Sequence, residues 1–213
     1  MKPHNFTVPV ELCHRRWLCS LFDLSATKNG GIDLYAGNTF IELKSGLRIP
    51  GKINERPPVF SVRHDQISGY KRRYCCQEFM GQSREDIDTP ELYFALLAYN
   101  LGTDINQIEG GADLEQFIHK REVWIVPWEF VESKLKNQKI IERITSRQKS
   151  TLKYRYVTIN GSKIKKEFEL KHGRFMTIEK RGGIIHLPKE SSLIDRLEEY
   201  SPFTEPRQRK FFF

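Results

Sequence analysis

The spacing of apolar positions along the chain predicts a helix followed by a β-hairpin. An apolar stripe with helical spacing runs through residues 8–22, which favours an amphipathic helix. Its members are Leu12, Cys13, Trp17, Leu18, Leu21 and Phe22. Residues 32–35 and 39–44 form two short β-like runs. Ala36-Gly37-Asn38 between them is typical of a hairpin turn.

Two continuous apolar runs, residues 92–99 and 123–128, predict buried central strands. Residues 112–120 favour a short helix between them, which predicts a strand, crossover, strand unit. Before these runs, residues 46–60 are rich in Gly and Pro and predict a surface loop. Residues 62–74 then predict a polar helix.

The last third of the chain has the alternation of β-structure. Residues 154–159, Asn160-Gly161 and residues 163–170 form the strongest hairpin signal in the sequence. A second pair of strands is predicted to flank Gly182-Gly183. Together these elements predict an α/β (α+β) protein, with a central mixed β-sheet flanked by helices.

The net charge of +8 is concentrated in one segment. Residues 134–181 contain fifteen Lys and Arg against four Glu, a net charge of +11, whereas residues 1–133 have a net charge of −3. Such a basic segment favours binding of a polyanion, because neutralised phosphates release their counterions. The sequence therefore predicts a catalytic body over 1–133, integrated with a basic, β-rich polyanion-binding region over 134–213.

Composition narrows the class of protein further. The 213 residues are 38% hydrophobic, enough for one substantial core. No apolar run approaches the length of about 20 residues that a membrane-spanning helix requires, and we expect a soluble, intracellular protein. Cys13, Cys19, Cys75 and Cys76 match no zinc motif and predict reduced thiols, although an iron–sulfur cluster stays open.

The chemistry is concentrated in Gly31-Ile32-Asp33 and Ile41-Glu42-Leu43-Lys44. Residues two apart on a strand share a face, so Glu42 and Lys44 project together. A hairpin would place Asp33 across from Glu42, and two such carboxylates suit Mg²⁺. Lys44 would then position or deprotonate the attacking water. A surface Asp beside an exposed Glu–Lys pair is the purely structural alternative.

These two motifs, with the strands at 92–99 and 123–128, resemble the PD-(D/E)XK nucleases, in particular type II restriction endonucleases. The resemblance covers about residues 8–132, and Ile32 replaces the Pro of the family name. It implies Asp33, Glu42 and Lys44 as catalytic residues. It also implies Mg²⁺, or Mn²⁺ in its place, held by Asp33, Glu42, the Leu43 backbone carbonyl and Glu11.

The resemblance further implies site-specific cleavage of double-stranded DNA that leaves 5′-phosphate ends. It implies a cytoplasmic enzyme of a prokaryote or phage, whose system includes a cognate DNA methyltransferase. A palindromic target would be matched by a homodimer, and residues 134–213 would then serve DNA recognition and dimerisation. The polar residues predicted to contact DNA are Gln66, Tyr70, Arg143, Arg147, Lys149, Arg155, Asn160, Lys163, Lys165 and Lys166.

Two alternatives remain open at this point. Gln66-x3-Tyr70 resembles the Gln-x3-Tyr motif of RecB-like nucleases, which favours a DNA repair or CRISPR-associated exonuclease, and a junction-resolving nuclease is also compatible. That branch often binds a cluster through one early and three late cysteines, and this chain has none after Cys76. The other alternative is a non-catalytic DNA-binding protein that uses only the basic region.

Overall fold

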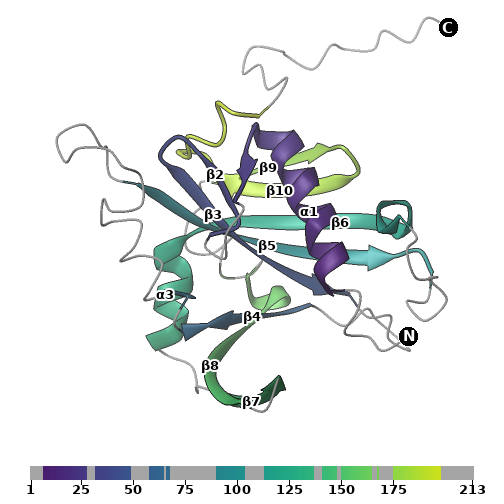
Figure 1. The fold of residues 1–213 in the computed structure, drawn as a ribbon. Helices are drawn as coiled ribbons and strands as arrows, with labels where there is room; N and C mark the ends of the chain where they lie inside the picture. The colour runs from purple at the N-terminus through teal and green to yellow at the C-terminus, as the bar shows by residue number, and fades with distance from the viewer. Residues whose placement is uncertain are drawn as a thin grey trace, which may run out of the picture.

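The central feature of the fold is a seven-stranded mixed β-sheet with helices on its faces (Figure 1). The computed structural model describes residues 7–27, 32–48, 58–64, 66–67, 90–103, 113–136, 141–147, 150–164, 167 and 175–197. In spatial order the strands are β1 (Ser25–Ala26), β2 (Leu34–Ala36), β3 (Thr39–Leu47), β5 (Glu91–Leu101), β6 (Ile118–Pro127), β10 (Gly183–Pro188) and β9 (Phe175–Lys180). The predicted α/β class, with a central mixed sheet flanked by helices, is therefore confirmed. No helix in these ranges has the length and apolar character needed to cross a bilayer.

The pairing of the strands differs from the sequence prediction in one respect. β3 runs parallel to β5 and β6 runs parallel to β10. The predicted crossover between β5 and β6 is wrong, because these two strands are antiparallel neighbours. The Gly102 N–H donates to the Phe117 carbonyl at 2.8 Å, which joins the end of β5 to the start of β6. The helix predicted at 112–120 is a short 3-10 helix, η4 (Leu114–Phe117), that leads directly into β6.

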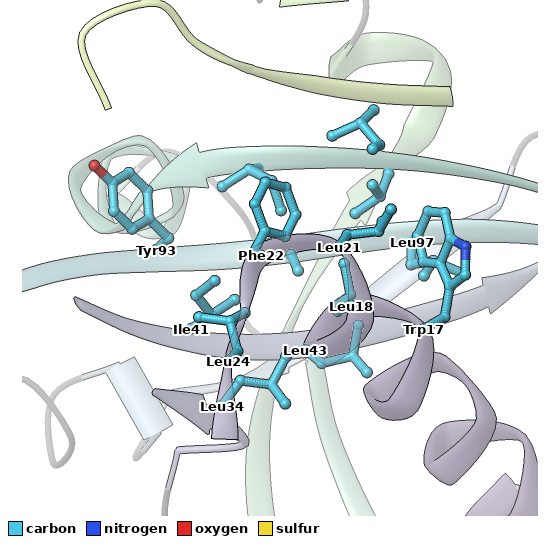
Figure 2. Packing of buried hydrophobic residues seen from close by; sticks show 14 of the residues in the cluster. Trp17, Leu18, Leu21, Phe22, Leu24, Leu34, Ile41, Leu43, Tyr93 and Leu97 are labelled. Carbon is cyan, nitrogen blue, oxygen red and sulfur yellow. The ribbon is translucent and has the colours of Figure 1, made fainter. Parts of the chain in front are cut away.

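One face of the sheet is covered by α1 (Thr7–Phe22), the helix predicted from the first apolar stripe (Figure 1). Its buried side chains meet side chains of the central strands, as Figure 2 shows. The helix contributes Trp17, Leu18, Leu21 and Phe22, and the strands contribute Leu34, Ile41, Leu43, Tyr93 and Leu97. The burial of these apolar side chains is the main contribution to the free energy that holds α1 in place over β3, β5 and β6.

Trp17 packs so closely against β10 that only glycine fits at position 183. A Cβ atom at Gly183 would lie 2.4 Å from Trp17 Cζ2. We therefore expect Gly183→Ala to lower the free energy of unfolding by about 1 to 3 kcal/mol, measured by urea denaturation. Gly102→Ala is the control, because its Cβ would meet nothing closer than 3.8 Å. Equal stability of the two variants would contradict this account of the packing.

The other face of the sheet is covered by α3 (Trp128–Lys136) and by a second, three-stranded sheet. That sheet has the order β4 (Val59–Arg63), β8 (Ser150–Asn160), β7 (Ile141–Arg147), and Figure 1 places it below the large sheet. Phe60, Val62 and Ile159 anchor it in the core.

The bounds of β3 and β4 differ from two of the boundaries predicted from the sequence. Val62 and Arg63 belong to β4, so the helix predicted at 62–74 starts later than expected; residues 64, 66 and 67 are helical, and 68–74 lie outside the described residues. The loop predicted at 46–60 is also shorter, because β3 continues to Leu47 and β4 begins at Val59. The pairing of β4 with β8 explains the change, since Val62 and Arg63 are in register with Val157 and Tyr156.

The hairpin predicted at Asn160-Gly161 is wrong. β8 ends at Asn160, and residues 161–164 are helical. The Asn160 side-chain oxygen accepts from the Ser162 N–H at 3.0 Å, which is the contact of a residue that caps a helix N-terminus. The strands that pair with β8 are instead β7 and β4, both of which precede it in the sequence.

The strands predicted around Gly182-Gly183 are confirmed as β9 and β10. They are joined by Arg181 and Gly182, whose φ angles of 45° and 72° suit a two-residue hairpin loop. β10 pairs with β6, so residues 175–188, which the charge pattern assigned to the basic region, complete the central sheet.

Candidate active site

The β2–β3 hairpin brings Asp33 next to the strand that contains Glu42 and Lys44. Leu34 pairs with Ile41 and Ala36 pairs with Thr39, so the next position of the same register sets Asp33 opposite Glu42. The Asp33 Oδ2 atom accepts from the Leu43 N–H at 2.8 Å. This is the spatial arrangement that the sequence predicted from a tight turn between the two motifs.

Glu42 is nearly inaccessible, with 2% of its surface exposed, and its two oxygens differ in their partners. The Oε1 atom accepts from Lys44 Nζ at 2.5 Å and from Gln66 Nε2 at 2.9 Å. The Oε2 atom is buried and has no hydrogen-bond partner among the described residues. Because an unpaired buried oxygen is costly, Oε2 is the atom that most needs a ligand.

Gln66 reaches this site because of the turn that follows β4. Its side-chain oxygen accepts from the Arg63 N–H at 3.2 Å, three residues earlier, as in a capping box at a helix start. The amide nitrogen is thereby directed at Glu42. Gln66 was predicted from sequence as a DNA-binding residue, whereas the structure shows it bound to Glu42. Tyr70, its predicted companion, lies outside the described residues.

Arg15 of α1 is the member of the site that the sequence analysis missed. Its Nη2 atom donates to Glu11 Oε1 at 2.7 Å and also to Asp33 Oδ1. Glu11 therefore enters the cluster through Arg15. The i, i+4 spacing of Glu11 and Arg15 on a predicted helix was the available signal for this pair.

Burial sets the electrostatics of the two carboxyl groups. Burial, helped by the nearby Asp33 charge and opposed by the charge of Lys44, raises the pKa of Glu42 from 4.5 to about 7. Burial also raises the pKa of Asp33, although the charges of Lys44 and Arg15 and the Leu43 N–H oppose this shift. Two buried acids side by side ionise more easily when a cation is present.

The donor set fits a hard divalent cation. No group of three His, Cys, Asp or Glu residues within the described ranges converges on one point. Mg²⁺ does not need one, because it is commonly held by one or two carboxylates and keeps several waters. Asp33 and Glu42 supply two carboxylates, and Glu42 Oε2, which has no hydrogen-bond partner among the described residues, can serve as a ligand atom. The Leu43 carbonyl as a further ligand stays a prediction.

The other residues predicted to bind DNA that the structure describes lie in or just after the three-stranded sheet. By position, Arg143 and Arg147 are on β7 and Arg155 is on β8, while Lys163 is exposed in the helical turn after β8. The Asn160 side-chain oxygen is engaged by Ser162. Lys149, Lys165 and Lys166 lie outside the described residues.

Fold and site together define a mixed α/β protein with a buried centre of two carboxylates and one lysine. Comparison of the chain with protein-family models, with curated proteins and with solved structures gave no significant match.

Proposed function

We propose that this protein is a Mg²⁺-dependent endonuclease that cuts double-stranded DNA at specific sites, as type II restriction enzymes do. The observation that favours it most is the buried cluster of Asp33, Glu42 and Lys44, in which one carboxylate oxygen has no partner. A buried charged cluster of this kind is expensive to keep for stability alone, and such clusters occur preferentially at functional sites.

The residues of the cluster have distinct roles in the proposed hydrolysis. Asp33 and Glu42 would hold the cation, and Gln66 fixes the rotamer of Glu42. When bound, Mg²⁺ supplies positive charge at the phosphate and lowers the pKa of water. Lys44 is 18% exposed on its side chain and already points at Glu42, so it would orient the attacking water and stabilise negative charge on the phosphate. Mn²⁺ is expected to substitute for Mg²⁺.

The three-stranded sheet supports DNA as the substrate because of where it starts. Arg63 pairs with Tyr156 of β8, and the Arg63 N–H binds Gln66, which contacts Glu42. From Tyr156 the strand continues six residues to Ser150, a reach of about 20 Å. The β7–β8 hairpin lies within the strongly basic segment 134–181. It therefore extends away from the proposed catalytic cluster, as a ribbon that reads a DNA groove would.

The assembly and the biological context follow from the same proposal. A palindromic target requires two active sites related by a two-fold axis, so we propose a homodimer. A site-specific nuclease inside a cell also requires protection of the host DNA, for which the cognate methyltransferase is the expected functional partner. We expect the protein to act in the cytoplasm.

One observation favours a second candidate, a RecB-like or junction-resolving repair nuclease. The contact between Gln66 and Glu42 is compatible with the Gln-x3-Tyr motif of that branch. The two nucleases differ in substrate, since the repair enzyme would prefer free ends or branches to an intact duplex site.

The deciding experiment is incubation of the purified protein with phage DNA and Mg²⁺. We expect discrete fragments on a gel, and intact DNA when EDTA replaces Mg²⁺. A smear would favour the repair nuclease. Intact DNA in Mg²⁺ and in Mn²⁺, together with tight binding of the same DNA, would show that the protein only binds DNA.

A further inference from the structure

Arg15 supplies a positive charge between two acidic side chains of the cluster. Its guanidinium bridges Glu11 and Asp33, and it is only 23% exposed. A carboxylate that holds a catalytic cation is commonly shared with a second one in sites with two metals. Here the Asp33 oxygen on the α1 side is bound by Arg15 instead.

The carboxylate oxygens that remain unpaired in the described part of the site are also consistent with a single ion. Asp33 Oδ2 accepts from Leu43, and Glu42 Oε1 accepts from Lys44 and Gln66. Glu42 Oε2 is the buried carboxylate oxygen that has no partner in the described part of the site. A second divalent cation near Glu11 would have to approach a fixed positive charge at short range, which is strongly repulsive.

Charge balance points the same way. The contacts above join three acidic side chains, Glu11, Asp33 and Glu42, with the two basic ones, Arg15 and Lys44. With all five ionised the cluster has a charge of −1. One divalent cation changes this to +1, which one phosphodiester neutralises, whereas a second cation would leave an excess of positive charge.

We infer that Arg15 takes the place of a second metal ion, so that each chain binds one divalent cation and Glu11 holds Arg15 rather than metal. This inference rests on the proposed nuclease function. Arg15 would then bind a non-bridging oxygen of the scissile phosphate and stabilise its charge, as a second cation does elsewhere. Its Nε–H, which is buried and has no partner among the described residues, is a free donor for that oxygen.

The test is the number of Mn²⁺ ions bound per chain, measured by electron paramagnetic resonance and isothermal titration without DNA. We expect one ion in the natural protein and in Arg15→Lys, which keeps the charge. Arg15→Gln should bind a second ion. Arg16→Gln, which removes an exposed charge from the next position of α1, is the matched control and should bind one. Two ions in the natural protein, or no second ion in a folded Arg15→Gln, would overturn the inference.

Glu11→Gln provides an independent measurement if Arg15→Gln does not fold. Because Glu11 is not a metal ligand in this scheme, its loss should change the Mn²⁺ affinity by less than about threefold. A loss of about tenfold or more would mean that Glu11 binds the ion and that the inference is wrong. Failure of the function itself has a different signature, namely no Mn²⁺ bound at all, or binding that Glu42→Gln leaves unchanged.

Discussion

Asp33→Asn, Glu42→Gln and Lys44→Ala should each lower the rate of DNA cleavage by a factor on the order of a thousand or more. The first two remove a carboxylate charge that would hold the cation, and the third removes the ammonium group that lies against Glu42. Rates are to be measured with saturating Mg²⁺ under single-turnover conditions, so that chemistry rather than product release is observed. DNA binding should stay within about threefold of the natural protein, because phosphate contacts supply most of the affinity.

Two controls separate loss of chemistry from loss of fold. Glu179→Gln and Lys189→Ala remove the same charges from exposed positions outside the cluster and should cut DNA normally. Glu42→Gln should also be no less stable than the natural protein above pH 7. The folded-state pKa of Glu42 is raised from 4.5 to about 7, so its contribution to stability is present below pH 4.5 and is lost as the pH rises through 7. Full activity in any one of the three variants would remove that residue from the catalytic centre.

The hairpin at the centre of the site could be predicted because its signals are local. Gly37 adopts φ of 55° in the two-residue loop, a conformation that glycine accepts readily. The alternation of Ile41, Glu42, Leu43 and Lys44 fixes which side chains face the core. Once the turn and the alternation are known, the register that sets Asp33 opposite Glu42 follows with no information from the rest of the chain.

The predictions that proved wrong concern segments whose structure is decided by partners distant in sequence. Val62 lies in a strand because Val157, almost a hundred residues away, pairs with it. Asn160-Gly161 is a strong local signal for a hairpin, but the Gly161 N–H donates to the Pro58 carbonyl at 2.9 Å and Asn160 caps the following helical turn. The Asn-Gly dipeptide can adopt either a hairpin turn or the start of a helical turn, and the hydrogen bond to Pro58 selects the helical turn.

Arg15 shows why a cluster of charges is harder to predict than a hairpin. The Glu11–Arg15 pair is evident from helical spacing, but its direction is not. Only the packing of Trp17, Leu18 and Leu21 against the sheet turns that edge of α1 toward Asp33. Which polar side chains contact Asp33 therefore depends on how the apolar stripe of α1 packs against the sheet.

His14, on the same helix, should make the stability of the protein depend strongly on pH. His14 is fully buried, its Nδ1 atom accepts from Arg121 Nε at 3.3 Å, and its ring packs edge-on against Tyr99. Burial, together with the nearby Arg121 charge, lowers the pKa of His14 from 6.5 to about 3. Below pH 6.5 the unfolded chain binds a proton that the folded chain does not, so stability falls by roughly 1 kcal/mol per pH unit until about pH 3. The full effect is several kcal/mol, a large part of the stability of an ordinary domain.

His14→Gln should remove this loss, because Gln can still accept from Arg121 but does not titrate. Urea unfolding at several pH values between 7.5 and 4 should give a gap between natural and variant stability that shrinks, or changes sign, as the pH falls. The difference between the two proteins is the quantity to compare, since the raised pKa values of Asp33 and Glu42 act in both and stabilise the folded state on acidification. His119→Gln, which removes an exposed imidazole from β6, should follow the natural protein. A constant gap at every pH would mean that His14 takes up its proton in the folded state, which the cation of Arg121 beside it should forbid.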